Sequence, residues 1–307
     1  MLATQLFPYI FLPSEKEAAN QSQRIFHGRG HAYPDLEFIN IDLYSKLLII
    51  TLYKEVELDQ LSELALKIKE ALPYIESIQA QKRYERHGEF VVLYPQSGEL
   101  VEHWQAVELG LNYHLSFGRQ RNTGIFLDIA NGRSWLKENS ADRKVLNLFS
   151  YTCAFSVAAL AGGAELVVNV DMSKASLSQG RENHKLNNQD LSKVKFEGVD
   201  IFKSFGRLKK HGPYDVLVCD PPSFQKGSVD IKRDYAKIIR RIPQLMNPNG
   251  DVMLCLNSPD LSEEFLLQQV EEHCPECEYQ LKIENPEVFR EAQEGKGLKV
   301  LLFKYLP

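Results

Sequence analysis

A short proline-rich segment holds the residue types most suited to chemistry in this chain. The sequence Cys-Asp-Pro-Pro-Ser-Phe spans residues 219–224 and follows an apolar run at 214–218. Two consecutive prolines cannot donate to a sheet ladder, and each restricts the residue before it, so a strand must end there in a stiff loop. In open parallel α/β sheets, this carboxyl end of the strands is where ligands bind. The candidate catalytic residues of the loop are Asp220, Pro221, Pro222 and Phe224.

A second segment has the composition of a cofactor turn. Residues 146–154 read Leu-Asn-Leu-Phe-Ser-Tyr-Thr-Cys-Ala, which predicts a strand turning into a helix. The absence of a G-x-G-x-x-G fingerprint argues against a dinucleotide site. Small and hydroxyl-bearing residues still let a cofactor approach the turn, with backbone N–H groups at the helix start facing a carboxylate. The candidate cofactor-binding residues here are Asn147, Phe149, Ser150, Tyr151 and Thr152.

Acidic residues follow the next two predicted strands. Asp171 lies about 20 residues beyond the first turn, where an acid can accept hydrogen bonds from both hydroxyls of a ribose. Met172 would then pack against adenine, and Ser173 would cap the next helix. Asp200 would accept from the adenine amino group, with Ile201 covering the ring. Simple helix capping is the alternative for both acids.

These loops require an alternation of strands and helices, which the sequence shows from residue 145 onward. The apolar runs lack polar alternation, as expected when both faces of a sheet are covered. Strands are predicted at 145–149, 165–170, 194–196, 214–219, 251–256, 279–283 and 298–303. Helices are predicted at 127–136, 154–160, 174–187, 201–209, 230–246 and 260–272, the last starting in a capping box of Asp260 and Glu263. The pattern indicates an α/β domain with a doubly wound, Rossmann-like sheet of seven strands.

The first 118 residues follow a different pattern, which predicts a small α+β domain. Strands are expected at 39–42 and 47–53, around a turn. One helical stripe comprises Leu61, Leu64, Ala65, Ile68 and Leu72. Segments 89–94 and 99–104 flank Pro-Gln-Ser-Gly and are expected to pair as a hairpin. The predicted domains are therefore 1–118 and 119–307, connected near residues 118–122.

Composition bounds the class of protein. The chain has 307 residues, 44% hydrophobic and 25% charged, which is typical of a globular protein large enough for two domains. No run approaches the roughly 18 uncharged apolar residues of a membrane span, and the first residues make a poor signal peptide. Five cysteines, an odd number, suit a reducing cytosol, so we expect a cytoplasmic protein with no membrane partner. A net charge of −5 provides no overall attraction for nucleic acid, so any such contact must be local.

Four motifs, in order along the chain, resemble one family. Residues 147–152, 170–173 (Val-Asp-Met-Ser) and 220–224 are similar to motifs of the bacterial methyltransferases that modify large-subunit ribosomal RNA. Residues 122–128 (Asn-Thr-Gly-Ile-Phe-Leu-Asp) resemble that family's entry segment, which adds Phe126 to the candidate cofactor-binding residues. The resemblance extends over residues 85–307. It implies a class I methyltransferase fold, S-adenosylmethionine as cofactor, and structured RNA, in particular ribosomal RNA, as partner.

The resembling family has a cytosine-C5 branch and a guanine-N7 branch. The C5 reaction needs a thiolate to add to cytosine C6, and in that branch the cysteine lies in the loop after the fifth strand. This chain carries Asn257 there, so the resemblance favours guanine N7. The N7 lone pair is already a nucleophile, so the protein needs only to orient it against the methyl group. Asp220 would orient the base or cofactor, Phe224 would stack on the base, and Asn257 would read its edge. The alternatives are C5 methylation through Cys219 or Cys255, and a non-catalytic RNA assembly factor that binds the cofactor.

Some residues depart from the family pattern or stand outside it. Cys153 replaces the usual glycine, and Ala130 lies among positions that are usually polar or arginine. Buried structural thiols are the simplest interpretation of Cys219 and Cys255. Residues 274–277 (Cys-Pro-Glu-Cys) resemble half a zinc site, but no second pair completes it, so we expect no metal.

Two groups of basic residues are candidate RNA contacts, with an ordinary solvated surface as the alternative. The group around the proline loop comprises Arg207, Lys209, Lys210, Lys226, Lys232, Arg233, Lys237, Arg240 and Arg241. The group beside the expected hairpin comprises Lys82, Arg83, Arg86 and His87.

Overall fold

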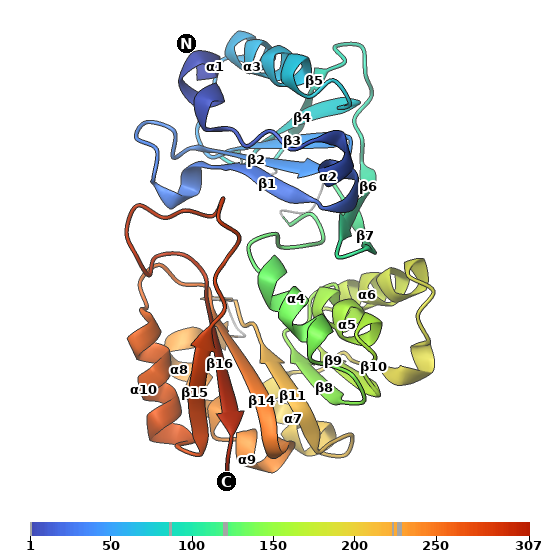
Figure 1. The fold of residues 1–307 in the computed structure, drawn as a ribbon, viewed down its shortest axis with the longest axis vertical. Helices are drawn as coiled ribbons and strands as arrows, with labels where there is room; N and C mark the ends of the chain where they lie inside the picture. The colour runs from blue at the N-terminus through green and yellow to red at the C-terminus, as the bar shows by residue number, and fades with distance from the viewer. Residues whose placement is uncertain (1, 86–87, 119–121, 223, 226–228) are drawn as a thin grey trace. The chain divides into compact units, whose positions relative to one another are not determined.

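The computed structural model describes residues 2–85, 88–118, 122–222, 224–225 and 229–307, which form two compact units (Figure 1). The N-terminal unit comprises residues 1–127 and 287–294, and the sheet unit comprises residues 128–286 and 295–307. The predicted boundary lies after residue 118, whereas the contacts extend the N-terminal unit to Leu127 and add Glu287–Glu294. Several residues named above lie outside the described residues: 119–121 of the connection, Arg86, His87, Ser223 and Lys226.

A five-stranded sheet in the order β1-β2-β3-β4-β5 forms the base of the N-terminal unit (Figure 1). The strands are β1 (Gln23–His27), β2 (Ile39–Tyr44), β3 (Leu47–Leu52), β4 (Ser77–Lys82) and β5 (Phe90–Tyr94). Only the β3–β4 pair is parallel, and the helix α3 (Leu58–Ala71) makes the crossover that such a pair requires. Its predicted stripe is confirmed, because Leu61, Leu64, Ala65 and Ile68 are buried. Short helices α1 (Leu2–Leu6) and α2 (Glu15–Asn20) precede the sheet.

The predicted hairpin across residues 89–104 is wrong. β5 pairs with β4, and the segment after it is held by Gln79 of β4, whose amide accepts from the Val101 N–H at 2.5 Å and donates to the Val101 carbonyl at 3.3 Å. Because a buried side chain satisfies this backbone, the segment needs no strand partner there. The hairpin forms instead between β6 (His103–Glu108) and β7 (Leu111–Ser116). Its two turn residues, Leu109 and Gly110, have φ of 56° and 74°, as in the two-residue turns whose twist suits a hairpin.

The sheet unit contains the predicted seven-stranded sheet, in the order β10-β9-β8-β11-β14-β16-β15 (Figure 1). The strands are β8 (Lys144–Leu148), β9 (Leu166–Val170), β10 (Val194–Glu197), β11 (Tyr214–Cys219), β14 (Met246–Leu256), β15 (Cys277–Lys282) and β16 (Lys299–Tyr305). The first five strands of the order pair in parallel, and β16 runs antiparallel to β14 and β15. The strand order reverses between β8 and β11, so the loops after these two strands share the edge where ligands bind.

Helices cover both faces of this sheet. On one face, α4 (Ala130–Glu138) and α5 (Ala154–Ala161) pack against Val145 and Val216. On the other, Leu146 and Leu217 pack against four helices. These are α7 (Ile201–Leu208), α8 (Ile231–Ile239), α9 (Ile242–Leu245) and α10 (Glu263–His273). Since neighbouring residues of β8 and β11 serve opposite cores, both strands are apolar throughout these positions. None of the helices in the described part of the chain is long and apolar enough to cross a membrane.

Two helix predictions need correction at their ends. α10 begins at Glu263 without a side-chain cap, so the predicted capping box with Asp260 is wrong. Glu263 instead lies 2.5 Å from Lys282 Nζ, which withdraws its carboxylate from the helix start. The predicted helix 230–246 is divided into α8 and α9, because Pro243 has no N–H to donate to the Ile239 carbonyl at the end of α8.

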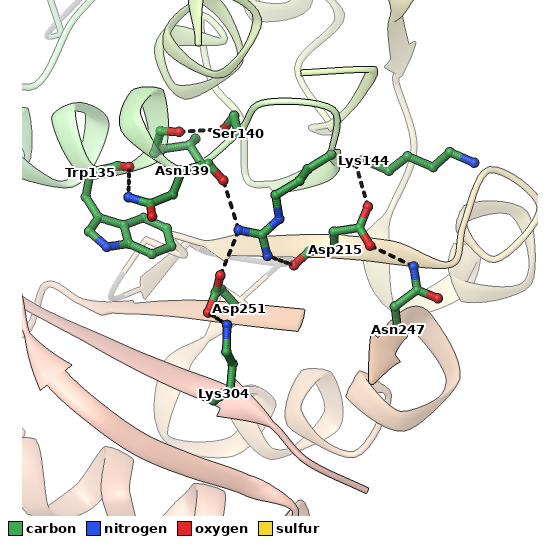
Figure 2. Close-up of polar contacts among 10 residues, drawn as sticks. Trp135, Asn139, Ser140, Lys144, Asp215, Asn247, Asp251 and Lys304 are labelled. Atoms are coloured by element: carbon green, nitrogen blue, oxygen red, sulfur yellow. Dashed lines mark hydrogen bonds and ion pairs between the residues drawn. The ribbon is translucent and has the colours of Figure 1, made fainter. Parts of the chain in front are cut away.

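Polar side chains tie the strands together at the amino end of the sheet (Figure 2). Arg143, just before β8, donates to the Asp215 carbonyl of β11 at 2.5 Å and pairs with Asp251 of β14 at 2.8 Å. Asp251 also contacts Lys304 Nζ of β16 at 2.6 Å. The Asp215 carboxylate accepts from Asn247 at 2.8 Å and from the first N–H of β8. Four strands are thereby locked at the edge opposite the ligand-binding edge.

A buried chain of hydrogen bonds crosses the layer between β8, β9, α5 and α6 (Lys174–Leu186). Asn147 donates to Asn169 at 2.9 Å, Asn169 donates to Ser156 at 2.8 Å, and Ser156 lies 2.9 Å from His184 Nε2. His184 Nδ1 lies 2.6 Å from Gln189 Oε1, which only accepts, so Nδ1 carries the proton and Nε2 accepts from Ser156. His184 is therefore neutral, and burial lowers its pKa to about 4.

The stability of the protein should fall as His184 is forced to take up a proton. Its pKa is lowered on folding, so between pH 6.5 and 4 the unfolded chain binds a proton that the folded chain does not, which costs roughly 3 kcal/mol. We expect the difference in unfolding free energy between wild type and His184→Gln to narrow by about that amount between pH 7 and pH 4, measured by urea denaturation. The exposed His103→Gln is the control. A constant difference between wild type and His184→Gln would contradict the assignment.

Candidate cofactor and substrate site

The loop after β8 has an unusual backbone. Phe149, Tyr151 and Cys153 have φ of 59°, 46° and 62°, although none of them is glycine. A left-handed conformation costs an ordinary residue roughly 1–2 kcal/mol, so the surroundings must hold this loop in place. Ser150 and Thr152, which alternate with the three, are buried. The predicted cofactor turn is therefore a constrained segment at the ligand-binding edge.

Asp171, directly after β9, holds that loop. Its Oδ2 accepts from the Tyr151 N–H at 2.9 Å, and its Oδ1 accepts from the Ser173 N–H at 2.7 Å. The cap of α6 is Ser173, as predicted, whose Oγ accepts from the Ser176 N–H at 3.2 Å. Helix capping is thus not the task of Asp171. Each carboxylate oxygen has a second lone pair, so Asp171 can also accept from a ligand. Met172, beside it, is 51% exposed.

Cys153, which stands where the resembling motif usually has glycine, packs closely on α6. Cys153 is fully buried, and a Cβ added at Gly180 would collide with its Sγ and lie 2.8 Å from its Cβ. Gly180 of α6 therefore leaves room for the Cys153 side chain. Burial raises the pKa of the Cys153 thiol, so this cysteine is a packing residue and no nucleophile.

Asp200 and Ile201 lie at the start of α7. The Asp200 Oδ1 accepts from the Phe202 N–H at 2.9 Å, so Asp200 is the N-cap of α7, and its Oδ2 lies 3.4 Å from Lys203 Nζ. Ile201 is 3% exposed and belongs to the core. The capping alternative thus describes what Asp200 does within the protein, and the adenine contacts stay predictions.

Three other predicted cofactor residues occupy different surroundings. Asn147 is buried inside β8, where its amide donates to Asn169 of β9. Phe149 is partly buried, with its ring 6.5 Å from that of Phe202. Phe126 is 41% exposed and belongs to the N-terminal unit. Their roles toward a cofactor stay predictions.

The proline loop follows β11, next to the end of β8. β11 pairs with β8 as far as Cys219 and Leu148, and the Asp220 nitrogen lies 3.5 Å from the Leu148 carbonyl oxygen, the limit of a hydrogen bond. Pro221 is buried and Pro222 is exposed. Phe224 lies in a two-residue strand, β12 (Phe224–Gln225), that pairs with β13 (Val229–Asp230). The β12–β13 pair thus comes directly before α8.

The Asp220 carboxyl is electrostatically perturbed. Burial raises its pKa to about 7, and the negative charge of Asp128 adds to this effect, while the positive charge of Arg133 opposes it. Arg133 is itself buried, with its guanidinium 6.0 Å from the Phe155 ring. Asp128 is the last residue of the entry segment and Arg133 lies five residues beyond it, and nothing in the sequence shows that either acts on Asp220. A perturbed acid at a ligand-binding edge is typical of a functional site.

Asn257 follows β14 and is exposed, and its contact with a substrate edge stays a prediction. The two nearby cysteines, Cys255 and Cys219, are buried structural thiols, as predicted, and burial raises the pKa of both. Tyr235 of α8, which sequence reasoning missed, donates to the Cys255 carbonyl at 2.9 Å. It occupies an interior position in a helical stripe, so its type and spacing indicate only packing.

The Cys274 and Cys277 sulfurs lie 3.5 Å apart in the buried core. Over the residues described, no group of three His, Cys, Asp or Glu side chains is arranged to hold a metal ion.

Ion pairs neutralise part of the basic group around the proline loop. Arg207 lies 2.6 Å from Glu197, and Arg233 and Lys237 both pair with Asp234, at 3.0 and 2.8 Å. These pairs hold the pKa of the buried Asp234 far below its usual range. The paired cations mainly stabilise α7 and α8 and are weaker candidates for RNA contacts than their number suggests.

Comparison with known proteins places this chain in a family. The model of the S-adenosylmethionine-dependent methyltransferase family matches residues 23–304. The chain is 32% identical over 224 residues to a ribosomal RNA large subunit methyltransferase I of Aeromonas salmonicida, covering 72% of this chain and 52% of that protein. It is 32% identical over 155 residues to a ribosomal RNA large subunit methyltransferase K/L of Pseudoalteromonas translucida, covering 49% and 22%. The chain thus spans about half or less of the length of these curated relatives.

A solved structure extends the similarity to the fold. The protein SMU.776, crystallised in complex with S-adenosylhomocysteine, superimposes with a TM-score of 0.81 and 26% identity, covering 94% of this chain and 76% of that chain. The family model spans both units and all four sequence motifs. The chain therefore belongs to the S-adenosylmethionine-dependent methyltransferase family.

Proposed function

We propose that this chain transfers a methyl group from S-adenosylmethionine to structured RNA, with ribosomal RNA as the substrate and guanine N7 as the acceptor atom. The observation that carries the proposal is the pairing of two loops at the strand-order reversal: the loop held by Asp171 after β8 and the Asp220 loop after β11. The RNA substrate is supported by the names of the curated relatives, which are ribosomal RNA methyltransferases. A methyltransferase that modifies ribosomal RNA would act in the cytoplasm.

The loop after β8, which Asp171 holds in place, has the chemistry to bind the cofactor. When bound, S-adenosylmethionine supplies a methyl group on a sulfonium, which a nucleophile can take without further activation. Asp171 would accept from the ribose hydroxyls, and the half-exposed Met172 would pack against adenine. The constrained loop of Phe149, Ser150, Tyr151 and Thr152 would border the rest of the cofactor. Because Asp171 holds this loop, one carboxylate would serve both the ribose and the loop.

The Asp220 loop would position the base. Guanine N7 has a lone pair and no proton, so the protein needs to orient it rather than to deprotonate it. Asp220, Pro221 and Pro222 would form a stiff wall beside the base, Phe224 would stack on it, and Asn257 would contact its edge. The ionised form of Asp220 can accept hydrogen bonds from guanine N–H groups, whereas the neutral form also donates.

Buried thiols count against the covalent alternative. Cytosine C5 methylation needs a thiolate at the base, and burial raises the pKa of both Cys219 and Cys255 and removes them from the surface. The resemblance puts the exposed Asn257 where the C5 branch has its cysteine. We therefore retain the non-covalent reaction.

Replacing Asp171 should weaken cofactor binding. In Asp171→Ala the ribose loses a charged acceptor and the loop loses its bond to the Tyr151 N–H, so we expect S-adenosylhomocysteine to bind roughly 100-fold more weakly by calorimetry. Asp190→Ala is the matched control, since Asp190 also accepts from a backbone N–H two residues on, but at the short helix before β10. Unchanged affinity in a folded Asp171→Ala protein would remove the ribose assignment.

The rate of methyl transfer should depend on the ionisation of Asp220. Its pKa is raised to about 7, so the carboxyl is largely neutral at pH 6 and largely ionised at pH 8. We expect kcat/KM to rise across this interval, with a midpoint at or below 7 once the cationic cofactor is present. In Asp220→Asn the step should vanish and the rate should fall on the order of 100-fold. The same pH step in Asp220→Asn would show that another group titrates, and Asp190→Asn serves as the control.

The RNA target can be found in cells. Mass mapping of ribosomal RNA from a strain that lacks this gene should show one missing methyl group, at a guanine, which the wild-type gene restores and the Asp220→Asn gene does not. An intact modification pattern would rule out ribosomal RNA.

Incubation with RNA containing 5-fluorocytosine separates the two chemistries, because only a covalent C5 mechanism yields a stable protein–RNA adduct, and we expect none.

A further inference from the structure

Three exposed or half-exposed side chains from distant segments meet on the N-terminal unit. The guanidinium carbon of Arg29 lies 4.6 Å from the centre of the Tyr53 ring, and that of Arg83 lies 5.9 Å from it. Arg83 Nη1 also lies 3.5 Å from the Tyr53 hydroxyl, and its Nη2 lies 3.5 Å from Asn122 Oδ1. Two permanent positive charges therefore share one aromatic ring. We call Arg29, Tyr53 and Arg83 the arginine platform.

The backbone beneath Arg29 is closely packed. A Cβ added at Gly28 would collide with the carbonyl oxygens of Leu36 and Ile39, and one added at Gly30 would collide with the carbonyl oxygen of Arg290. The Arg29 N–H donates to Asn40 at 3.3 Å. The two glycines therefore let a tight turn sit against neighbouring backbone while the residue between them is directed outward and exposed. Rigid placement of a long cation lowers the entropy lost when it binds a ligand.

In the described part of the chain, neither arginine of the platform is paired directly with an acid. Within the described residues, no carboxylate forms an ion pair with Arg29 or Arg83. The neighbouring Arg24, in contrast, is paired with Asp42 at 2.7 and 3.0 Å, and Lys82 is paired with Glu85 at 3.5 Å. The positive charges also act on the buried His27. Burial and the charges of Arg24 and Arg29 lower its pKa to about 3.

We propose that the arginine platform binds phosphodiester groups of the RNA substrate, an inference that rests on the proposed function. Guanidinium groups present planar pairs of donors that match phosphate oxygens, and they bind phosphate in preference to remaining unpaired beside a second cation. Cation–π contact with Tyr53 holds both guanidinium groups beside the same ring. The chain carries a net charge of −5, so a local site of this kind supplies the attraction that its overall charge does not. Of the basic group predicted beside the hairpin, Arg83 is the member that takes part.

The test is the salt dependence of RNA binding. A ribosomal RNA fragment containing the modified nucleotide is titrated with wild type and with Arg29→Gln/Arg83→Gln by filter binding between 50 and 300 mM KCl, a range chosen around physiological salt. Losing two phosphate contacts should reduce the slope of log K against log salt by about 1.4 to 1.8 and weaken binding at least tenfold at low salt. Lys67→Gln is the matched control, because Lys67 also stacks on a ring, that of Phe7 at 5.9 Å, in the same unit.

The outcomes separate this inference from the proposed function. If wild type methylates RNA and the double variant shows the same slope and affinity, the platform does not bind RNA, although the function stands. If wild type binds S-adenosylhomocysteine but no RNA, the proposed function is wrong, and the inference about the platform is overturned with it. The double variant should bind S-adenosylhomocysteine as wild type does, and a loss of that binding would mean that the variant is misfolded. In that case the single variant Tyr53→Leu, which keeps both charges but removes the ring between them, tests the same salt slope. A mononucleotide that binds as tightly as RNA would assign the platform to small phosphates and overturn the inference.

Discussion

The carboxylate of Asp171 is the interaction on which the candidate site depends. It lies at the end of one strand and accepts from the backbone of the loop that follows the neighbouring strand, at the left-handed residue Tyr151. Three non-glycine residues with positive φ would otherwise relax toward ordinary conformations, and the loop would lose its shape. A loop held in this way is formed before the ligand arrives, which reduces the ordering that binding must supply.

The rest of the sheet unit keeps the two strand ends in register. At the amino edge, Arg143 and Asp251 link β8, β11, β14 and β16 through charged hydrogen bonds (Figure 2). In the layer behind β8, the chain of donors from Asn147 to His184 connects the strand to α5 and α6. The Arg143 network lies at the amino edge, away from Asp171 and Asp220. Asn147 and Asn169 are the next-to-last residues of β8 and β9, so the second network supports the strands just before the loops that carry the candidate site.

The sequence predicts this part of the protein well because its signals are local. The central strands β8, β9, β11 and β14 each carry an apolar run, and Asp171, Asp220 and Asn257 each come directly after one of them. The N-terminal unit is predicted less completely, because its signals depend on partners. The strand β4 escapes detection since its buried Gln79 and Gln81 read as polar, and the β6–β7 turn escapes because Leu109 is not a usual turn residue. The arginine platform could not be predicted, since its residues come from three separate segments.

The most direct test of the account is a crystal structure of this protein with S-adenosylhomocysteine. We expect both ribose hydroxyls within hydrogen-bonding distance of the Asp171 carboxylate, the bond from the Tyr151 N–H retained, and the sulfur facing the Asp220 loop. A cofactor bound with its ribose away from Asp171, or a loop that abandons its left-handed residues on binding, would contradict the central claim that this carboxylate organises the site.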